Sequence, residues 1–273
     1  MLLQKGVSMS IEDVKAFYNE SVEHEWGRMD RHPFEFAINK AYMDRYIKPG
    51  DRVLDIGGGP GRYSLYLAQR GCDVTLVDLS EGNVKFALEK AKELGLPLKG
   101  VCANACELTK SVSGEYDHVL MMGPLYHLIE LEDRRKAIQE ALAVLKRGGT
   151  FYAAFIQLIG GLIYYGARMV EGVLDEQDQT FLEALVAGES YGGPAFTEAY
   201  FAQRKDAEAL LAEFPLEKLH MVASEGVCAP FEPQLLEAAE EVRAKWLEIS
   251  LQVCEQEQYL GMCEHLLYVG RKR

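Results

Sequence analysis

The sequence lacks the cysteine patterns that mark metal-binding and disulfide-rich proteins. Its six cysteines form no C-x-x-C pair, and no cysteine–histidine cluster has zinc-finger spacing; they stand at positions 72, 102, 106, 228, 254 and 263. A chain of 273 residues is long enough to bury a core without cross-links. We therefore expect reduced thiols, a cytoplasmic location and no bound metal.

Basic side chains are scarce as well. The chain has 29 Lys and Arg against 42 Asp and Glu, which gives a formal net charge of −13. A protein that binds the phosphate backbone of a nucleic acid needs a basic surface. We therefore expect no nucleic-acid partner.

Long apolar runs are also missing. The stretch 151–167 contains Gln157, is interrupted by Gly160 and Gly161, and is shorter than the roughly 20 residues that span a membrane. Residues 1–8 lack the apolar region of a signal peptide. We interpret 151–167 as a buried strand followed by another element, and expect no contact with a membrane.

What the sequence does contain is an alternation of short apolar segments with longer amphipathic ones. The pattern predicts strands at 52–56, 73–78, 98–103, 116–122 and 150–157, and helices at 63–70, 80–94 and 131–145. Strands that alternate with helices of this length form a parallel sheet in an α/β protein. Residues 10–48, which precede the alternation, read as amphipathic helices with turns.

The second half of the chain departs from this rhythm. Residues 158–200 show no clean strand and are rich in Tyr and Phe, so we interpret them as a helical insertion. The segments after it predict a helix at 201–214, strands at 218–224 and 265–271, and one long helix at 233–258. The apolar stripe of that long helix fits packing on the protein's own body or a dimer contact, so we expect a monomer or a homodimer.

The residues that carry chemistry begin with a glycine-rich turn between the first strand and its helix. It runs from Asp55 through Gly57, Gly58 and Gly59 to Arg62. Glycines let the backbone approach a ligand closely at the carboxyl end of a parallel sheet. Arg62 stands where a dinucleotide-binding turn has its third glycine, and no Gly-Lys-Ser/Thr follows as in a phosphate-binding loop. A ligand without a pyrophosphate is favoured.

The end of the second strand supplies an acid, Asp78, which lies 21 residues after Gly57 (78 − 57 = 21). An acid at this place can accept hydrogen bonds from the two hydroxyls of a ribose. An Asp at a strand end also serves as a helix-cap residue or a solvated charge. Together with the glycine turn, Asp78 indicates a ligand that contains a nucleoside.

These motifs resemble those of class I S-adenosylmethionine-dependent methyltransferases. Asp55-Ile-Gly-Gly-Gly-Pro-Gly61 resembles their first motif, and Leu76-Val-Asp78 resembles their second-strand acid. The stretch 116–128 and the stretch 145–151 resemble the fourth strand and the approach to the fifth, in the same order. The resemblance implies a seven-stranded, mostly parallel Rossmann-like sheet with helices on both faces and an antiparallel last strand.

The resemblance also implies a division of the chain and a set of cofactor contacts. The expected parts are a closing N-terminal segment (1–48), the cofactor-binding core (49–157), a cap (158–200) and the completion of the core (201–273). The expected contacts to S-adenosylmethionine are Tyr18, Arg28, Asp55, Gly57, Gly58, Gly59, Asp78, Leu79, Ala103, Asn104, Ala105, Met122 and Gly123. Many relatives have Asp where Asn104 stands, and the Asn amide oxygen can still pair with the adenine amino group.

The acceptor is expected to be a small molecule, methylated by direct displacement. His127 is the candidate general base, although a structural role for this histidine stays open. Expected acceptor contacts are Tyr126, His127, Tyr164, Tyr165 and Tyr191, with the alternative that the insertion's aromatics form a mini-core. The alternative functions are a nucleotide-dependent oxidoreductase and a non-catalytic module that binds the cofactor.

Overall fold

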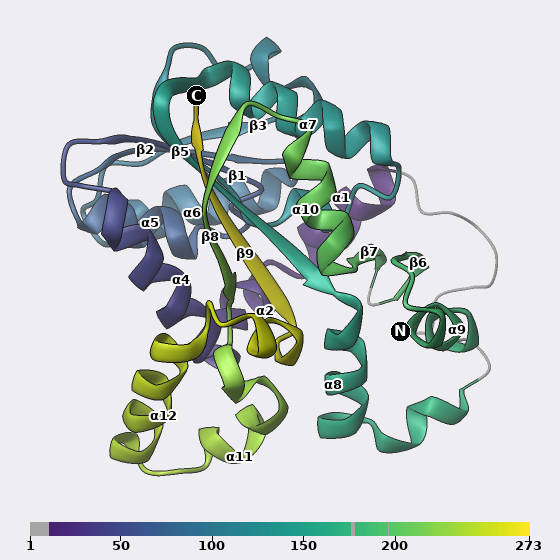
Figure 1. Cartoon of the computed structure of the whole chain (residues 1–273). Coiled ribbons are helices and arrows are strands. Elements are labelled where there is room, and N and C mark those ends of the chain that lie inside the picture. The colour runs from purple at the N-terminus through teal and green to yellow at the C-terminus, as the bar shows by residue number, and fades with distance from the viewer. Residues whose placement is uncertain (1–10, 176–177, 196) are drawn as a thin grey trace.

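The computed structural model describes residues 11–175, 178–195 and 197–273. In this part of the chain one twisted sheet of nine strands crosses the molecule, with helices packed around it (Figure 1). Among the described residues, no helix combines the length and the apolarity needed to cross a membrane.

The parallel half of the sheet agrees with the predicted alternation. Its strands are β1 (Arg52–Ile56), β2 (Asp73–Asp78), β3 (Lys99–Cys102), β4 (Tyr116–Met121) and β5 (Leu145–Gln157). The helices between them are α5 (Arg62–Gln69), α6 (Glu81–Glu93) and α7 (Leu131–Val144), with the short helices η1 (Ala105–Lys110) and η2 (Pro124–Tyr126). The strands lie in the order β3-β2-β1-β4-β5 and pair in parallel, as the alternation of strands and helices predicts.

The sheet continues past β5 through two antiparallel pairings. Strand β9 (His265–Lys272) pairs with β5, and β8 (Leu216–Ala223) pairs with β9. Strand β5 is buried along nearly its whole second half, where Phe151, Tyr152 and Phe155 are at most 1% exposed. These seven strands confirm the mostly parallel fold and the antiparallel last strand.

The strand count is where the prediction was wrong, because the described sheet has nine strands rather than seven. The two additional strands, β6 (Tyr191–Pro194) and β7 (Glu198–Ala202), form a hairpin, and β7 pairs with the last two residues of β5. Strand β6 reads Tyr-Gly-Gly-Pro, which has poor strand propensity. Its conformation is decided by pairing with β7, which a local pattern does not reveal.

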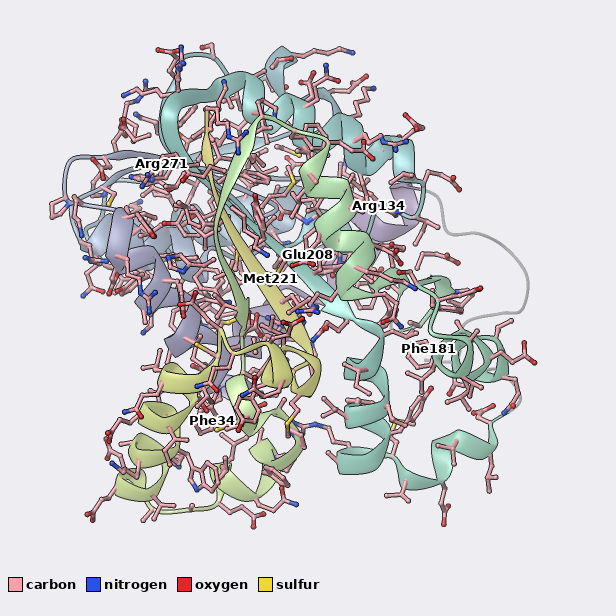
Figure 2. The ribbon with its side chains drawn as sticks, in the orientation of Figure 1. Phe34, Arg134, Phe181, Glu208, Met221 and Arg271 are labelled. Carbon is pink, nitrogen blue, oxygen red and sulfur yellow. The ribbon has the colours of Figure 1, made fainter. Side chains whose placement is uncertain are left out.

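The rest of the insertion is helical, as expected. It holds α8 (Leu158–Arg168), η3 (Val170–Leu174) and α9 (Gln179–Ala187). Its own buried cluster is centred on Phe181, apart from the main core that contains Met221 and from a third cluster that contains Phe34 (Figure 2). Helix α10 (Arg204–Ala212) then returns the chain to the sheet.

The single long helix predicted at 233–258 was wrong. The chain forms η5 (Gly226–Phe231), α11 (Glu232–Leu236), α12 (Glu240–Val253) and η6 (Glu257–Met262), with Ala239 in an extended conformation between α11 and α12. The break changes the phase of the apolar stripe, so Val242 and Ile249 remain 46% and 38% exposed. Trp246 and Leu247 pack inward instead.

Four N-terminal helices precede the sheet, and the first two contact α6, which follows β2. They are α1 (Ile11–Glu20), α2 (Val22–Trp26), α3 (Arg28–Arg31) and α4 (Pro33–Tyr46). Asn19 Oδ1 accepts hydrogen bonds from Ser80 Oγ (2.6 Å) and Gly82 N (3.1 Å) at the start of α6. Arg62 donates two hydrogen bonds to Asp30 in α3. These contacts hold α1 and α3 next to the glycine turn.

Candidate functional site

The glycine turn after β1 has a backbone that only glycine adopts easily. Gly57 and Gly59 have φ values of +66° and +55°, in the left-handed region. A Cβ on Gly57 would lie 2.5 Å from Pro124 Cδ, and one on Gly58 would lie 2.8 Å from an Asp55 oxygen. At Gly59 a Cβ would meet no atom within 4 Å. Gly59 is therefore the point where the turn faces open space.

Asp78 fastens this turn to the start of α6. Its Oδ2 accepts the N–H of Gly59 (2.8 Å), while its Oδ1 accepts from Ser80 N (2.8 Å) and Asn83 Nδ2 (3.2 Å). Burial raises the pKa of the carboxyl group, although these donors oppose the rise. The residue that caps α6 is Ser80, whose hydroxyl accepts from Asn83 N. Asp78 therefore supports the turn, and its Oδ2, which has one donor, can accept a further hydrogen bond.

Asp55 lies underneath the turn rather than on its surface. The side chain is fully buried, and its Oδ2 accepts a hydrogen bond from Ser64 Oγ (2.7 Å). Its Oδ1 is buried without a hydrogen-bond partner. Burial raises the pKa of this carboxyl group to about 6. A positive charge placed near this buried carboxyl group would favour its ionised form.

The other expected cofactor contacts surround the same edge of the sheet. Leu79 follows β2 and is half-buried, and the segment 103–105 follows β3 and is also half-buried. Asn104 Oδ1 accepts the N–H of Cys106 (2.9 Å) and caps η1, so the amide oxygen already has one donor. After β4, Met122 and Gly123 are half-buried, and a Cβ on Gly123 would come within 2.9 Å of the Gly57 carbonyl. The fold brings these residues together.

His127 lies beside the loop after β4, in contact with the N-terminal segment. Its Nε2 is 2.6 Å from the hydroxyl of Tyr18, and its ring lies 4.8 Å from that of Tyr126. Burial lowers the pKa of His127 to about 4. Tyr126 lies near Gly123, since the Tyr126 hydroxyl is 3.8 Å from the Cβ position of that glycine. Tyr18 reaches His127 with its only polar side-chain atom.

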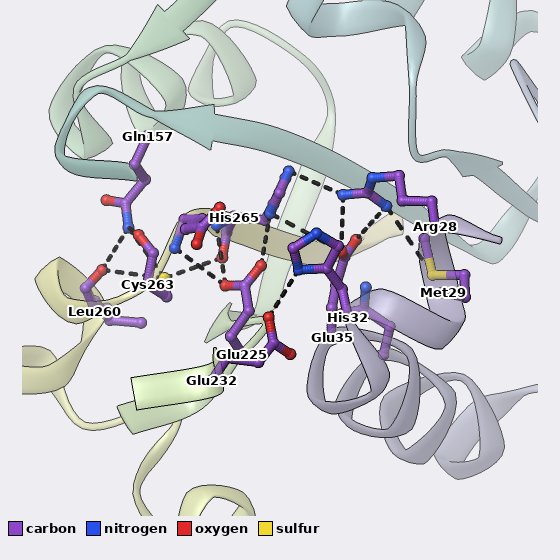
Figure 3. A network of polar contacts seen from close by, with 12 residues as sticks. Arg28, Met29, His32, Glu35, Gln157, Glu225, Glu232, Leu260, Cys263 and His265 are labelled. Carbon is purple, nitrogen blue, oxygen red and sulfur yellow. Dashed lines mark hydrogen bonds and ion pairs between the residues drawn. The ribbon is translucent and has the colours of Figure 1, made fainter. Parts of the chain in front are cut away.

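Arg28 is held in a buried ionic network (Figure 3). Its guanidinium donates to both oxygens of Glu35 (2.8 and 3.3 Å) and lies 3.2 Å from His265 Nε2. His265 Nδ1 is 2.6 Å from Glu225 Oε1. Burial opposes protonation of His265, but the charges of Glu35 and Glu225 raise its pKa to about 9. The Arg28 charge thus balances these acids, which no sequence motif indicates.

The same network contains a possible set of metal ligands. Glu35, Glu225 and His265 each place one ligand atom within 4.8 Å of the others. Arg28 and the backbone N–H groups of Glu264 and His265 already bond to the carboxylates. We therefore describe Glu35, Glu225 and His265 as part of an ionic cluster with Arg28.

The three tyrosines of the insertion that are expected to contact the acceptor do not share one environment. Tyr164 on α8 is 43% exposed. Tyr165 and Tyr191 pack on Phe181, with ring centroids 6.2 and 5.3 Å apart, and the Tyr191 hydroxyl donates to Pro194 O (3.0 Å). Tyr165 and Tyr191 therefore belong to the insertion's cluster, which favours the mini-core alternative for these two. Tyr126 packs against the edge of this cluster.

Two contributors to the site were missed by sequence reasoning. Arg62 was read only as a departure from a dinucleotide motif, yet it donates to Asp30 (2.7 and 3.0 Å) and to the Trp26 carbonyl (3.1 Å). Asn19 joins α1 to α6. Asn19 lies outside every motif, and Arg62 ends the glycine turn without any signal for its partners, because both act across contacts between distant segments.

Comparison with known proteins decides the family of the core. Residues 53–149 match the family model described as "Methyltransferase domain". These residues belong to the methyltransferase domain family. The match begins in β1 and ends in β5, so it contains the glycine turn, Asp78 and the loop that carries His127.

Curated relatives of this domain are named for different methyl acceptors. A glycine/sarcosine N-methyltransferase of Parasynechococcus marenigrum (strain WH8102) is 32% identical over 51% of this chain and 52% of its own length. A ubiquinone biosynthesis O-methyltransferase of Bordetella avium (strain 197N) is 36% identical over 37% of this chain and 40% of its own length. The chain spans about half or less of the length of these relatives.

Solved structures extend the likeness to the whole fold. The 1,6-didemethyltoxoflavin-N1-methyltransferase of Burkholderia thailandensis, with bound 1,6-didemethyltoxoflavin and S-adenosylhomocysteine, superposes with a TM-score of 0.61. The match covers 99% of this chain and 93% of the other, at 15% identity. At this identity the likeness shows the fold alone.

Proposed function

We propose that this protein transfers a methyl group from S-adenosylmethionine to a small-molecule acceptor. The observation that carries the proposal is the turn at 55–61, which faces open space at Gly59 and is held by Asp78 within a methyltransferase domain. Relatives named for small acceptors support the class of acceptor.

The residues present fit the cofactor. Gly59 has room for a ligand against the backbone, and Asp55 Oδ1 is a buried acceptor without a partner beneath the turn. Asp78 would hold the ribose, Leu79 and the segment 103–105 the adenine, and the backbone at Met122 and Gly123 the methionine part. When bound, S-adenosylmethionine supplies a methyl group on a positively charged sulfur, which is an activated electrophile.

The chain's own part in the reaction is to position the acceptor and to exclude water. Displacement requires the acceptor atom in line with the methyl group, and holding it there supplies much of the acceleration. Tyr126 and His127 lie where the acceptor would approach, next to Gly123. The segment α1–α3, held by Arg62 and Asn19, covers this edge of the sheet. Arg28 is kept by Glu35 as a buried cation nearby.

The test is calorimetry with S-adenosylhomocysteine. Gly59→Val would place a branched side chain in the space before the turn, and we expect a folded protein with little or no binding. Gly95→Val is the matched control, because Gly95 also has a positive φ (+68°) and open surroundings but ends α6 away from the turn. Equal affinity of both variants for S-adenosylhomocysteine would remove the turn from the site.

Two further experiments separate the alternatives. Titration of the wild-type protein with NAD tests the oxidoreductase alternative. We expect no NAD binding, because Arg62 occupies the third-glycine position and is hydrogen-bonded to Asp30. Transfer of a labelled methyl group to a metabolite extract tests the non-catalytic module. Tight binding of S-adenosylhomocysteine without any transfer would favour that module.

A further inference from the structure

A small cavity lies between α7 and α10, and residues of both helices and of β5 and β7 line it. Its volume is about 250 Å³. The two helices lie side by side (Figure 1), and Arg135 on α7 donates two hydrogen bonds of 2.7 Å each to Glu213 on α10. Pockets for drug-sized ligands measure roughly 300–1,000 Å³, so this cavity has room for a smaller molecule. Its apolar wall is made by Leu131, Phe155, Ala207 and Leu210.

Arg134, which is labelled in Figure 2, brings a buried positive charge to this cavity. The residue is 5% exposed, and its guanidinium carbon lies 3.6 Å from the centre of the Tyr200 ring. Nη1 donates to the carbonyls of Leu128 (2.6 Å) and Ile129 (2.7 Å), whereas Nε is buried without a hydrogen-bond partner. Within the described part of the chain no carboxylate forms an ion pair with Arg134, and burial lowers its pKa. The guanidinium therefore lacks the counter-charge that buried cations ordinarily have.

The cavity also holds two carboxylates in different states. Glu213 is paired with Arg135, and this hydrogen-bonded pairing lowers the pKa of Glu213. Asp206 Oδ2 accepts a hydrogen bond from Ser190 Oγ (2.6 Å), and no basic side chain of the described residues pairs with Asp206. The lining thus contains one cation and one anion without an ionic partner, Arg134 and Asp206, beside an apolar wall.

We propose that this cavity binds a free amino acid with an apolar side chain. The carboxylate of the ligand accepts hydrogen bonds from the Arg134 guanidinium, and its ammonium group donates to Asp206. The apolar side chain lies against Leu131 and Leu210. A ligand with both charges is favoured, because an anion alone would approach Asp206 and a cation alone would approach Arg134 without compensation. An uncharged ligand would leave both groups unpaired.

The site lies next to the loop after β4, but other elements form it than those that carry the expected cofactor contacts. The two carbonyls that Arg134 holds belong to Leu128 and Ile129, which follow His127 directly. The expected cofactor contacts come from the N-terminal segment and from the loops after β1, β2, β3 and β4. An amino acid held by Arg134 is therefore not the methyl acceptor. It adds a second anchor to the residue that holds this loop.

Calorimetry with L-leucine tests the site, because this amino acid is small and apolar beyond its two charged groups. We expect a dissociation constant of about 1 mM or below. Isopentylamine lacks the carboxylate of L-leucine and isocaproate lacks its ammonium group, and each should bind at least about tenfold more weakly. Absence of L-leucine binding at about 10 mM, or equal binding of either analogue, would overturn the proposal.

A substitution at the rim fills the cavity and leaves its buried charges in place. Ala209 lines the cavity on the exposed side of α10, so Ala209→Phe should abolish L-leucine binding in a folded protein. Ala212→Phe is the matched control, because Ala212 is also exposed on α10 but is not among the residues that line the cavity. Asp206→Asn keeps the shape of the side chain and should weaken L-leucine binding about tenfold.

Thermal unfolding checks that these variants are folded. Wild-type affinity for L-leucine in Ala209→Phe or in Asp206→Asn would contradict the site, and so would an equal loss of affinity in Ala212→Phe.

A second titration separates this site from the cofactor site. With S-adenosylhomocysteine at saturation, the affinity for L-leucine should be unchanged or higher, because two ligands that stabilise the same loop favour each other's binding. A fall of about tenfold or more would mean that L-leucine competes with the methionine part of the cofactor, and would overturn the proposal. A protein that binds L-leucine but not S-adenosylhomocysteine would contradict the proposed methyl transfer and leave the amino-acid site standing.

Discussion

At the scale of single residues, the site carries acids whose burial works against their ionisation. Asp55 is the clearest case, since it is fully buried with one unpartnered oxygen and a pKa raised to about 6 from 3.8. Such a group makes the protein less stable when it is charged. Its position under the glycine turn fits an acid whose charge is neutralised by a positively charged ligand, as the proposed cofactor is.

The raised pKa of Asp55 sets a pH dependence of stability. The native state holds this proton more tightly than the unfolded state, so the free energy of unfolding falls as the pH rises from about 4 to about 6, and the loss is complete above that range. Asp55→Asn removes the charge. At pH 8 we expect its free energy of unfolding to exceed that of wild type, by at most about 3 kcal/mol.

Denaturant unfolding at pH 4 and pH 8 measures this effect. Asp73→Asn is the control, because Asp73 lies exposed at the start of β2 and pairs with Lys99 on the surface. That change should alter stability by less than about 1 kcal/mol at either pH. A lower stability of Asp55→Asn than of wild type at pH 8 would contradict this prediction. It would mean that the ionised Asp55 side chain is stabilised by the unliganded protein.

At the scale of elements, the N-terminal helices depend on a few side chains for their place over the site. Arg62→Ala removes two hydrogen bonds to Asp30, one to the Trp26 carbonyl and a cation–π contact with the Trp26 ring. We expect faster amide hydrogen exchange in 15–31 and unchanged exchange in β1 and β4, because local opening needs few contacts to break.

Arg135→Ala is the control for that experiment. Arg135 also makes paired hydrogen bonds to a carboxylate, Glu213, but on the surface of α7. It should leave exchange in 15–31 at the wild-type rate. Unchanged exchange in Arg62→Ala would mean that Asn19 and the Tyr18–His127 contact are enough to hold the segment.

The insertion is the second element whose role the contacts clarify. Tyr191 is 9% exposed and packs on Phe181 and Phe201, so Tyr191→Ala should cost about 3 kcal/mol of stability and leave the affinity for S-adenosylhomocysteine unchanged. Tyr164→Ala, on the exposed side of α8, should leave stability unchanged. Thermal unfolding and calorimetry measure both. A stable Tyr191→Ala protein with impaired methyl transfer would restore Tyr191 as an acceptor contact.

At the scale of the whole molecule, the ionic network ties together three distant parts of the chain. Arg28 and Glu35 come from the N-terminal helices, Glu225 precedes η5, and His265 begins β9 (Figure 3). Glu35→Gln would leave the Arg28 cation buried without its main partner. We expect a loss of about 3–5 kcal/mol in the free energy of unfolding.

A surface pair provides the comparison. Glu132→Gln removes one of the two carboxylate partners of Arg135 within the first turn of α7, where the Glu132 side chain is 81% exposed, and should cost less than about 1 kcal/mol. Denaturant unfolding of the two variants measures the difference. Equal stabilities would contradict the idea that the buried Arg28 charge depends on Glu35.

Much of the core was predictable because its signals are local. The apolar strands β1, β2 and β4 and the helices between them follow from periodicity, and parallel pairing follows from their alternation. The glycines of the turn stand where a positive φ or a close approach excludes other residues, as Gly57 shows against Pro124. The sequence by itself therefore determined the parallel half of the sheet and the place of the glycine turn, with Asp78 beside it.

Only the tertiary structure decided the rest, because those features depend on contacts between segments far apart in the chain. Strand β6 exists through its pairing with β7, and the predicted long helix breaks at Ala239, before α12. Arg28 bonds to Glu35 and His265, and Tyr18 meets His127, through contacts that no spacing in the sequence records. Local patterns report backbone preference and burial, whereas the partner of a buried polar group is set by which distant side chain the fold places within hydrogen-bonding distance.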